Sequence, residues 1–344
     1  MKRILIIRPS AVGDIVMASP MIRSLRRGFP DARIVWLAEP AMADLLHHPQ
    51  LDGVIFWDKG RWRRLLKGGR VLALFREIRS LRRQLRSERF DIALDAQGLL
   101  RSRVLARLSG ATRRIGFDSR EPGRFLMTEI ISRGPGTKRM SSEYRHMMTA
   151  IGLSPNGFPP ELAVKAEDAD AMRKRRRAAG IDGAYAVLCP FTTRPQKHWF
   201  EDRWAALAGE IRKRMGFPVV MLGGPNDAGA ARSIAIAAEN VLHDLTGTTT
   251  LGQSMAVLQD AALIVGVDTG LTHMGTAFGR PTVALFGATR PYLETGRETT
   301  AVIYHPRECS PCRRRPTCRG EFDCMAAISV DEVLTTVLEI GSHN

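Results

Sequence analysis

The sequence of 344 residues lacks an apolar run long enough to cross a membrane as a helix, which needs about 20 such residues. It also has no Gly-x-Gly-x-x-Gly fingerprint for a dinucleotide, no repeat of solenoid period and no low-complexity tract. The apolar segment 4–7 is too short for the hydrophobic region of a secretory signal. We therefore expect a cytoplasmic protein without membrane spans.

Aromatic residues are scarce. They make up 6% of the chain, and few of them accompany its basic segments. Proteins that bind single-stranded nucleic acid stack the bases on aromatic rings, and no known nucleic-acid-binding motif is present. These absences argue against nucleic acid as a partner.

Cysteine is scarce too, and four of the five cysteines cluster: Cys309, Cys312, Cys318 and Cys324. A structural zinc site, an iron–sulfur site and two disulfides all remain open for this cluster, although a reducing cytoplasm disfavours disulfides. We interpret the cluster as local stapling of the chain. Cys189 stands alone at the end of an apolar run, and we expect it to be a buried apolar residue at a strand end.

Positive charge is abundant, and its excess lies entirely in the first half of the chain. Residues 1–160 hold 30 Lys+Arg and 14 Asp+Glu, whereas residues 161–344 hold 21 of each. A basic surface without further function would spread over both halves. The split therefore predicts that the first half faces a polyanion: nucleic acid, a phosphorylated glycolipid or an anionic membrane surface.

Short apolar runs alternate with amphipathic segments along most of the chain. We expect strands at 4–8, 34–38, 54–57, 92–95, 113–117, 185–190, 219–223, 263–267 and 282–286. We expect helices at about 20–28, 70–89, 99–109, 201–215, 227–239, 251–261 and 272–279. This alternation predicts an α/β protein with parallel, doubly wound sheets. A stretch rich in Pro and Gly between 152 and 183 separates two domains, which we place at 1–165 and 166–344.

Segment 8–15, Arg-Pro-Ser-Ala-Val-Gly-Asp-Ile, lies between the first expected strand and a helix. Gly13 would permit a tight turn, and Asp14 would lie at the carboxyl edge of the sheet. From the residues alone, Asp14 is either a helix cap or a general base.

Segment 59–89 contains twelve Lys+Arg and two Glu, and it predicts an amphipathic helix with a cationic face. Such a face is either a solvated surface or a binding site for the phosphates of a substrate or for anionic lipid headgroups.

Two segments of the second half suit a diphosphate. Segment 190–199 places two hydroxyls, an arginine and a lysine on an expected strand-to-helix loop, where lysine would offset the charge of a departing phosphate. Segment 265–274 passes from an apolar strand through Asp268, Thr269 and Gly270 into a helix. The amino end of a helix presents free N–H groups and a partial positive charge to an anion.

These motifs together resemble glycosyltransferase family 9, the lipopolysaccharide heptosyltransferases, over nearly the whole chain. The resemblance rests on residues 10–14, 192–199 and 268–273, of which the last are the most specific. Residues 116–122 and the Thr-Thr-Arg-x-x-Lys-x-Trp pattern are similar to the heptosyltransferase I branch. The resemblance implies the GT-B architecture: two Rossmann-like, doubly wound domains that face a central cleft, with the acceptor bound by the first and the donor by the second.

The resemblance also implies a role for each matched residue. Asp14 would be the base that deprotonates the acceptor hydroxyl, and Lys197 would stabilise the leaving ADP. The donor would be bound by Thr192, Thr193, Lys197, Asp268, Thr269, Gly270, Leu271 and His273. The acceptor would be bound by Ser10, Gly13, Arg61, Arg63, Arg64 and Arg120.

The implied reaction is an inverting, single displacement that moves heptose from ADP-heptose to Kdo-bearing lipid A. No catalytic metal or other cofactor is expected, since the ADP-sugar is a substrate. The protein would work at the cytoplasmic face of the inner membrane, in peripheral contact with its anionic surface and without nucleic acid. Two alternatives stay open: a relative that uses another nucleotide sugar or acceptor, such as a heptosyltransferase II, and a nucleic-acid-binding protein with a cysteine module.

Overall fold

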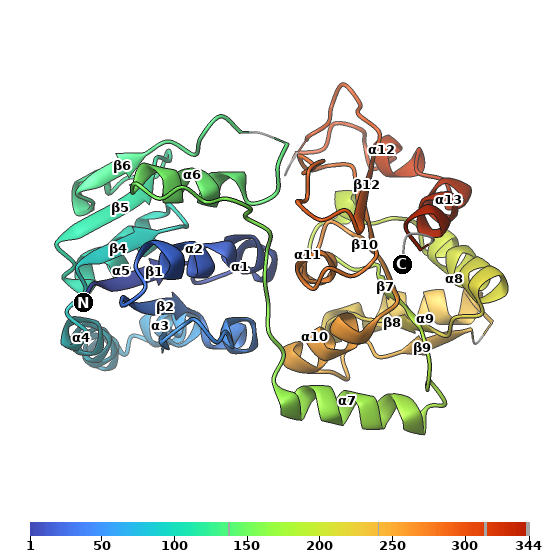
Figure 1. Cartoon of the computed structure of the whole chain (residues 1–344), viewed down its shortest axis with the longest axis horizontal. Coiled ribbons are helices and arrows are strands. Elements are labelled where there is room, and N and C mark those ends of the chain that lie inside the picture. The colour runs from blue at the N-terminus through green and yellow to red at the C-terminus, as the bar shows by residue number, and fades with distance from the viewer. Residues whose placement is uncertain (137, 240, 313–314, 342–344) are drawn as a thin grey trace. The chain divides into compact units, whose positions relative to one another are not determined.

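The computed structural model describes residues 1–136, 138–239, 241–312 and 315–341. The chain divides into two compact units. The first comprises Met1–Thr137 with Ser141–Ala163, and the second comprises Lys138–Met140 with Val164–Asn344. Each unit is built on its own six-stranded sheet (Figure 1). None of the described helices is long and apolar enough to span a membrane.

The two sheets have the same topology. The strands of the first are β1 (Arg3–Ile7), β2 (Arg33–Ala38), β3 (Gly53–Phe56), β4 (Ile92–Asp95), β5 (Arg113–Phe117) and β6 (Glu129–Ile131). The strands of the second are β7 (Ala186–Cys189), β8 (Val219–Met221), β9 (Leu242–Asp244), β10 (Leu263–Val267), β11 (Thr282–Phe286) and β12 (Thr300–Tyr304). Their orders are β3-β2-β1-β4-β5-β6 and β12-β11-β10-β7-β8-β9, with every pairing parallel. Each is the doubly wound Rossmann order, which confirms the predicted α/β class.

Helices cover both faces of each sheet (Figure 1). The first unit contains α1 (Val12–Ala18), α2 (Pro20–Gly28), η1 (Pro40–Leu46), α3 (Lys59–Lys67), α4 (Val71–Ser87), α5 (Leu100–Ser109), η2 (Arg124–Leu126) and α6 (Ser142–Ala150). The second contains α7 (Ala166–Ala178), η3 (Pro195–Lys197), α8 (Glu201–Met215), η4 (Pro225–Asp227), α9 (Ala228–Ala237), α10 (Leu251–Asp260), α11 (Gly270–Ala277), α12 (Asp323–Ala326) and α13 (Val330–Gly341). The central strands are buried along their length, as strands covered on both faces must be.

Sequence patterns located the central strands but missed β6, β9 and β12 at the sheet edges. None of these three strands has more than one buried residue. An edge strand has a neighbour on one side only, so fewer of its side chains are buried. Strands β6 and β9 are only three residues long and show no clear apolar run, whereas β12 (Thr-Ala-Val-Ile-Tyr) does contain one. Cys189 ends β7 and is fully buried, as expected.

Two glycines let α11 pack closely on the second sheet. A Cβ on Gly266, in β10, would lie 2.1 Å from Thr272 Oγ1 and 2.8 Å from Cys189 Cβ. A Cβ on Gly275, in α11, would lie 2.7 Å from Ile264 Cδ1. Both positions must therefore lack a side chain, because real atoms do not approach so closely.

We expect Gly266→Ala to lower the free energy of unfolding by about 3 kcal/mol, since the added methyl must displace Thr272 and β7. The matched control is Gly209→Ala in α8, where a Cβ meets nothing within 4 Å. That change should raise stability by about 1 kcal/mol through helix propensity. Urea denaturation of both variants measures the difference, and equal stabilities would contradict the close packing.

Candidate active site

The carboxyl ends of β1 and β4 adjoin where the strand order of the first sheet reverses, which is where doubly wound proteins bind ligands. Asp14 lies just after β1, in the first turn of α1, with 40% of its side chain exposed. Its Oδ2 accepts a hydrogen bond from the Ala11 N–H at 3.3 Å and forms an ion pair with Arg8. Oδ1 has no hydrogen-bond or ion-pair partner among the described residues, so one oxygen anchors the carboxylate and the other is open to a ligand.

The partner of Asp14 is itself buried. Arg8 is 7% exposed, donates to the Ala96 carbonyl at 3.0 Å and lies 6.0 Å from the centre of the Tyr144 ring. Burial acts to lower the pKa of Arg8, but Tyr144, Asp14 and Glu143 together raise it. The guanidinium therefore stays charged and fixes the direction of Asp14.

The structure corrects the expected role of Gly13. The chain enters α1 directly at Val12, and Gly13 is not among the described glycines with positive φ. The predicted tight turn is therefore wrong, since Gly13 occupies an ordinary helical position. Asp14 does act as a cap, because its carboxylate accepts the Ala11 N–H at the start of α1.

Glu39, which follows β2, joins the segments after β1 and β3. Its Oε1 accepts a hydrogen bond from Ser10 Oγ at 3.0 Å and lies 3.6 Å from Lys59 Nζ. The predicted arginines of α3 follow Lys59. Arg61 is paired with Glu77 at 2.7 Å, Arg64 lies 4.0 Å from Asp58, and Arg63 is exposed on α3.

Arg120 is exposed on the loop after β5, and a buried arginine holds that loop in place. Arg103 in α5 is fully buried. Its guanidinium donates to the carbonyls of Phe117, Glu121 and Pro122 and to Ser119 Oγ, at 2.8 to 3.1 Å. Ser10, Asp14, α3 and Arg120 thus all follow the carboxyl ends of strands in one sheet.

In the second unit, Asp268 lies at the centre of a buried network at the reversal point between β10 and β7. Lys197 Nζ, from η3, lies 2.8 Å from its Oδ2, and Thr289 Oγ1 donates to the same oxygen at 2.5 Å. His273 Nε2, from α11, lies 3.2 Å from Oδ1. His273 Nδ1 lies 2.6 Å from the Tyr292 hydroxyl. In a neutral imidazole, Nε2 donates to Asp268 and Nδ1 accepts from Tyr292.

This network controls the charge of Asp268. Burial alone would raise the pKa of Asp268, but the hydrogen bond from His273 and the ammonium of Lys197 outweigh burial and hold that pKa well below its usual range. Burial raises the pKa of Tyr292 well above its usual value, so this hydroxyl remains a donor. Asp268 is therefore a permanent anion that holds Lys197 in position.

We expect Asp268→Asn to reduce the dependence of stability on pH. A carboxyl whose pKa is lower in the folded state adds stability above its unfolded pKa of about 3.9, and this stability is lost as the pH falls below that value. The variant should be roughly 3 kcal/mol less stable at pH 7, and the difference from wild type should shrink below pH 4. Denaturation of wild type and variant at pH 7 and below pH 4 measures the difference in stability. The control is Asp170→Asn, which changes an exposed carboxylate. A difference independent of pH would contradict this assignment.

The other predicted donor residues surround this network. Thr192 and Thr193 follow β7, and the Thr192 carbonyl lies 2.8 Å from His198 Nε2. Thr269 precedes α11 in an extended conformation, and Gly270 and Leu271 begin the helix, two residues earlier than predicted. The first N–H groups of α11 therefore belong to Gly270 and its neighbours, next to Asp268.

The arrangement suits an anionic ligand. An ammonium has three N–H donors, so Lys197 retains two beyond its bond to Asp268. The amino end of α11 adds backbone N–H groups and the positive end of the helix dipole. Hydroxyls of Thr192 and Thr193 lie on the neighbouring loop. Ammonium, helix-terminal N–H and hydroxyl groups are of the kinds that suit a diphosphate.

Sequence reasoning missed five residues that position the candidate site: Arg8, Glu39, Arg103, Thr289 and Tyr292. Arg8 lies in the same segment, 8–15, as Asp14. Its closeness in sequence to a candidate base could therefore have indicated an ion pair with Asp14. Thr289 and Tyr292 lie about 20 residues from their partners and outside any recognised segment. No local pattern marks such residues.

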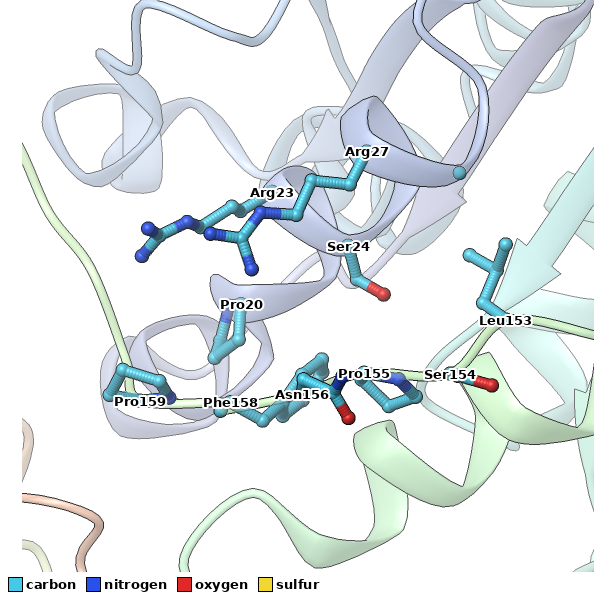
Figure 2. A pocket seen from close by; sticks show the side chains of 12 residues that line it. Pro20, Arg23, Ser24, Arg27, Leu153, Ser154, Pro155, Asn156, Phe158 and Pro159 are labelled. Carbon is cyan, nitrogen blue, oxygen red and sulfur yellow. The ribbon is translucent and has the colours of Figure 1, made fainter.

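Two other features lie apart from the predicted residues. The first unit contains a hollow of about 250 Å³. Figure 2 shows Arg23 and Arg27 of α2 on one side of it and the segment from Ser154 to Pro159 on the other. The five cysteines are free thiols. Within the described ranges, no group of three or more His, Cys, Asp or Glu side chains is arranged to hold a metal ion.

Comparisons with known proteins match most of the chain. The model of glycosyltransferase family 9 (heptosyltransferase) matches residues 78–322. Lipopolysaccharide heptosyltransferase 1 of Pseudomonas aeruginosa is 28% identical, over 92% of this chain and 87% of the relative. Lipopolysaccharide heptosyltransferase 3 of Escherichia coli is 25% identical, over 80% and 81%. The structure of E. coli heptosyltransferase WaaC with ADP-2-deoxy-2-fluoro heptose superposes with a TM-score of 0.75 at 24% identity, covering 98% and 99%.

Proposed function

Because the chain belongs to glycosyltransferase family 9, the heptosyltransferase family, we propose that it transfers heptose from ADP-heptose to the Kdo-bearing lipid A core of lipopolysaccharide. The chain is a glycosyltransferase by family. Relatives named heptosyltransferase 1 and 3 support the sugar and the lipopolysaccharide acceptor class. The solved relative with a fluorinated ADP-heptose supports ADP-heptose as the donor.

The observation that carries this proposal is the ion pair of Lys197 with Asp268 beside the amino end of α11. We propose that the second unit binds ADP-heptose there. Lys197 and the α11 amides bind the diphosphate, and Thr192 and Thr193 donate further hydrogen bonds. As the bond from the anomeric carbon to the diphosphate oxygen breaks, negative charge grows on that oxygen, and Lys197 stabilises it. Asp268 and His273 act by keeping Lys197 in place.

We propose that the first unit binds the acceptor and supplies the base. Asp14 Oδ1 takes the proton of the acceptor hydroxyl while that oxygen attacks the anomeric carbon, which inverts its configuration. Arg8 orients the Asp14 carboxylate through their ion pair. Ser10, Gly13, Arg61, Arg63, Arg64 and Arg120 are the proposed contacts to the anionic acceptor. The basic excess of residues 1–160 supports an acceptor rich in phosphates and carboxylates.

The first experiment is to incubate purified protein with ADP-heptose and Kdo-bearing lipid A, and to measure ADP release and product mass. One added heptose together with ADP release establishes donor, acceptor and reaction. A parallel reaction with acceptor that already carries one heptose distinguishes a type I activity from the type II and III activities named among relatives. Absence of ADP binding would contradict the donor site.

We propose a location at the cytoplasmic face of the inner membrane, where such an acceptor would be embedded. Peripheral contact with that membrane follows from the acceptor, because lipid A is anchored by its acyl chains.

A further inference from the structure

The corner between α3 and α4 exposes four large apolar side chains. Leu66 is 62% exposed, Val71 61%, Leu72 79% and Phe75 65%. The chain reverses at Gly69, whose φ of +65° suits glycine, so these side chains gather at one end of the helix pair. We call Leu66, Val71, Leu72 and Phe75 the apolar corner.

The exposure of the apolar corner does not arise from a loosely packed helix. Leu81 and Leu85 of α4 are 7% and 0% exposed and pack into the core with residues of β1 and α5. This packing fixes the rotation of α4 about its axis. Leu72 and Phe75 therefore face outward because the core residues face inward, and Figure 1 shows α4 (teal) at the outside of the first unit.

Beyond the apolar corner, the outer surface of α4 is cationic. A hollow of about 540 Å³ is lined by Ser87 and five arginines, which we call the arginine hollow: Arg79, Arg82, Arg83, Arg86 and Arg89. None of the five forms an ion pair with a carboxylate in the part of the chain that the structure describes. Five adjacent guanidinium groups repel one another, so their grouping indicates that anions from outside the protein compensate them.

Both features extend over the outer face of α4, with Leu66 added from the end of α3 and Arg89 from just after α4. Phe75, Arg79, Arg83 and Arg86 follow at intervals of three or four residues, which places them along one side of α4. A bilayer of anionic lipid offers the matching order of environments, because an apolar interior lies beneath a layer of phosphates. Amphipathic helices bind such surfaces by burying apolar side chains below the headgroups and placing basic side chains among them.

We propose that the apolar corner and the arginine hollow together form a docking surface for an anionic lipid bilayer. The side chains of the apolar corner enter the acyl region, and the arginines bind headgroup phosphates. This inference rests on the proposed function for its biological setting and deepens it, because it assigns the membrane contact to named residues. Nucleic acid or a free phosphorylated sugar would compensate the arginines but leave the apolar corner in water.

The test is cosedimentation of the full chain with vesicles that contain neither acceptor nor sugar nucleotide. Vesicles of phosphatidylcholine mixed with phosphatidylglycerol should bind the protein, and added salt should weaken this binding because it screens the charges. Vesicles of phosphatidylcholine alone should bind it much less. Equal binding to both kinds of vesicle would overturn the electrostatic part of the proposal.

Two variants separate the two parts of the surface. Arg79→Gln combined with Arg83→Gln and Arg86→Gln should lower partitioning onto anionic vesicles about 100-fold, as expected for three basic side chains at an anionic surface. Leu72→Ser combined with Phe75→Ser should lower it at least about 10-fold through lost apolar burial. Unchanged vesicle binding in the Leu72/Phe75 variant, or duplex DNA binding as tight as that to vesicles, would overturn the proposal.

Matched controls remove the same number of positive charges or apolar side chains from the surface of the second unit. Arg173→Gln with Lys174→Gln and Arg177→Gln removes three charges from α7, and Ile236→Ser with Leu338→Ser removes two exposed apolar side chains. Both controls should retain wild-type vesicle binding. If they lost as much binding as the α4 variants, overall charge or hydrophobicity would explain the binding and the proposed surface would be wrong. Since vesicle binding needs no substrate, a failed transfer assay would overturn the proposed function without changing this result.

Discussion

Replacing Asp14 by alanine is expected to lower kcat for sugar transfer about 10³-fold, within the range that general bases contribute. The reason is geometric: Oδ2 is occupied by Ala11 N–H and Arg8, whereas Oδ1 has no such partner within the described part of the chain and is available for the acceptor proton. Asp14→Asn should lower kcat by as much, because an amide keeps the shape of the carboxylate but does not act as a base. The measurement is kcat from ADP release at saturating substrates.

The binding of ADP should distinguish loss of the base from loss of the fold. We expect both Asp14 variants to bind ADP with wild-type affinity in calorimetry, since the proposed donor residues belong to the other unit. The matched control is Asp31→Ala, which removes an exposed carboxylate at the amino end of β2. It should retain kcat within about twofold, as surface substitutions away from a site usually do. Near-normal turnover in Asp14→Ala would rule out its role as the base.

Replacing Lys197 by methionine is expected to lower kcat roughly 10²- to 10³-fold, the usual effect of removing one group that stabilises charge in a transition state. Methionine keeps the length of the side chain and removes its charge. ADP should also bind more weakly, because the proposed mechanism has Lys197 contact the diphosphate before and during the reaction. Kinetics over a range of ADP-heptose concentrations separates the two effects.

The effects of Lys197→Met on kcat and on KM distinguish two roles for Lys197. A rise in KM with unchanged kcat would show that Lys197 binds donor and transition state equally, which contradicts stabilisation of the leaving group. The control is Lys213→Met on α8, where the side chain is 78% exposed. It should leave both constants unchanged. Thermal unfolding must accompany these assays, since the variant leaves buried Asp268 without its ammonium partner.

Sequence patterns placed the central strands well, and the physical reason is burial. Strands β10 and β11 begin and end at the predicted residues, because a strand buried on both faces is a nearly continuous apolar run. Strand β5 also has the predicted bounds, although it begins with two half-buried arginines. The same reasoning failed for β12 at a sheet edge and for the start of α1. Glycine permits a tight turn but does not require one, and Gly13 lies inside α1.

The amino-acid sequence by itself determined the alternation of strands and helices, the concentration of positive charge in residues 1–160 and the segments that hold Asp14, Lys197 and Asp268. The first and last of these properties are local, because each depends on neighbouring residues in the chain, and the charge excess is a sum over composition that needs no fold. The tertiary structure decided which atoms meet: Arg8 with Asp14, Tyr292 with His273, and Lys197 with Asp268 across 71 positions of sequence. It also decided that Leu72 and Phe75 face solvent, because the rotation of α4 follows from core packing.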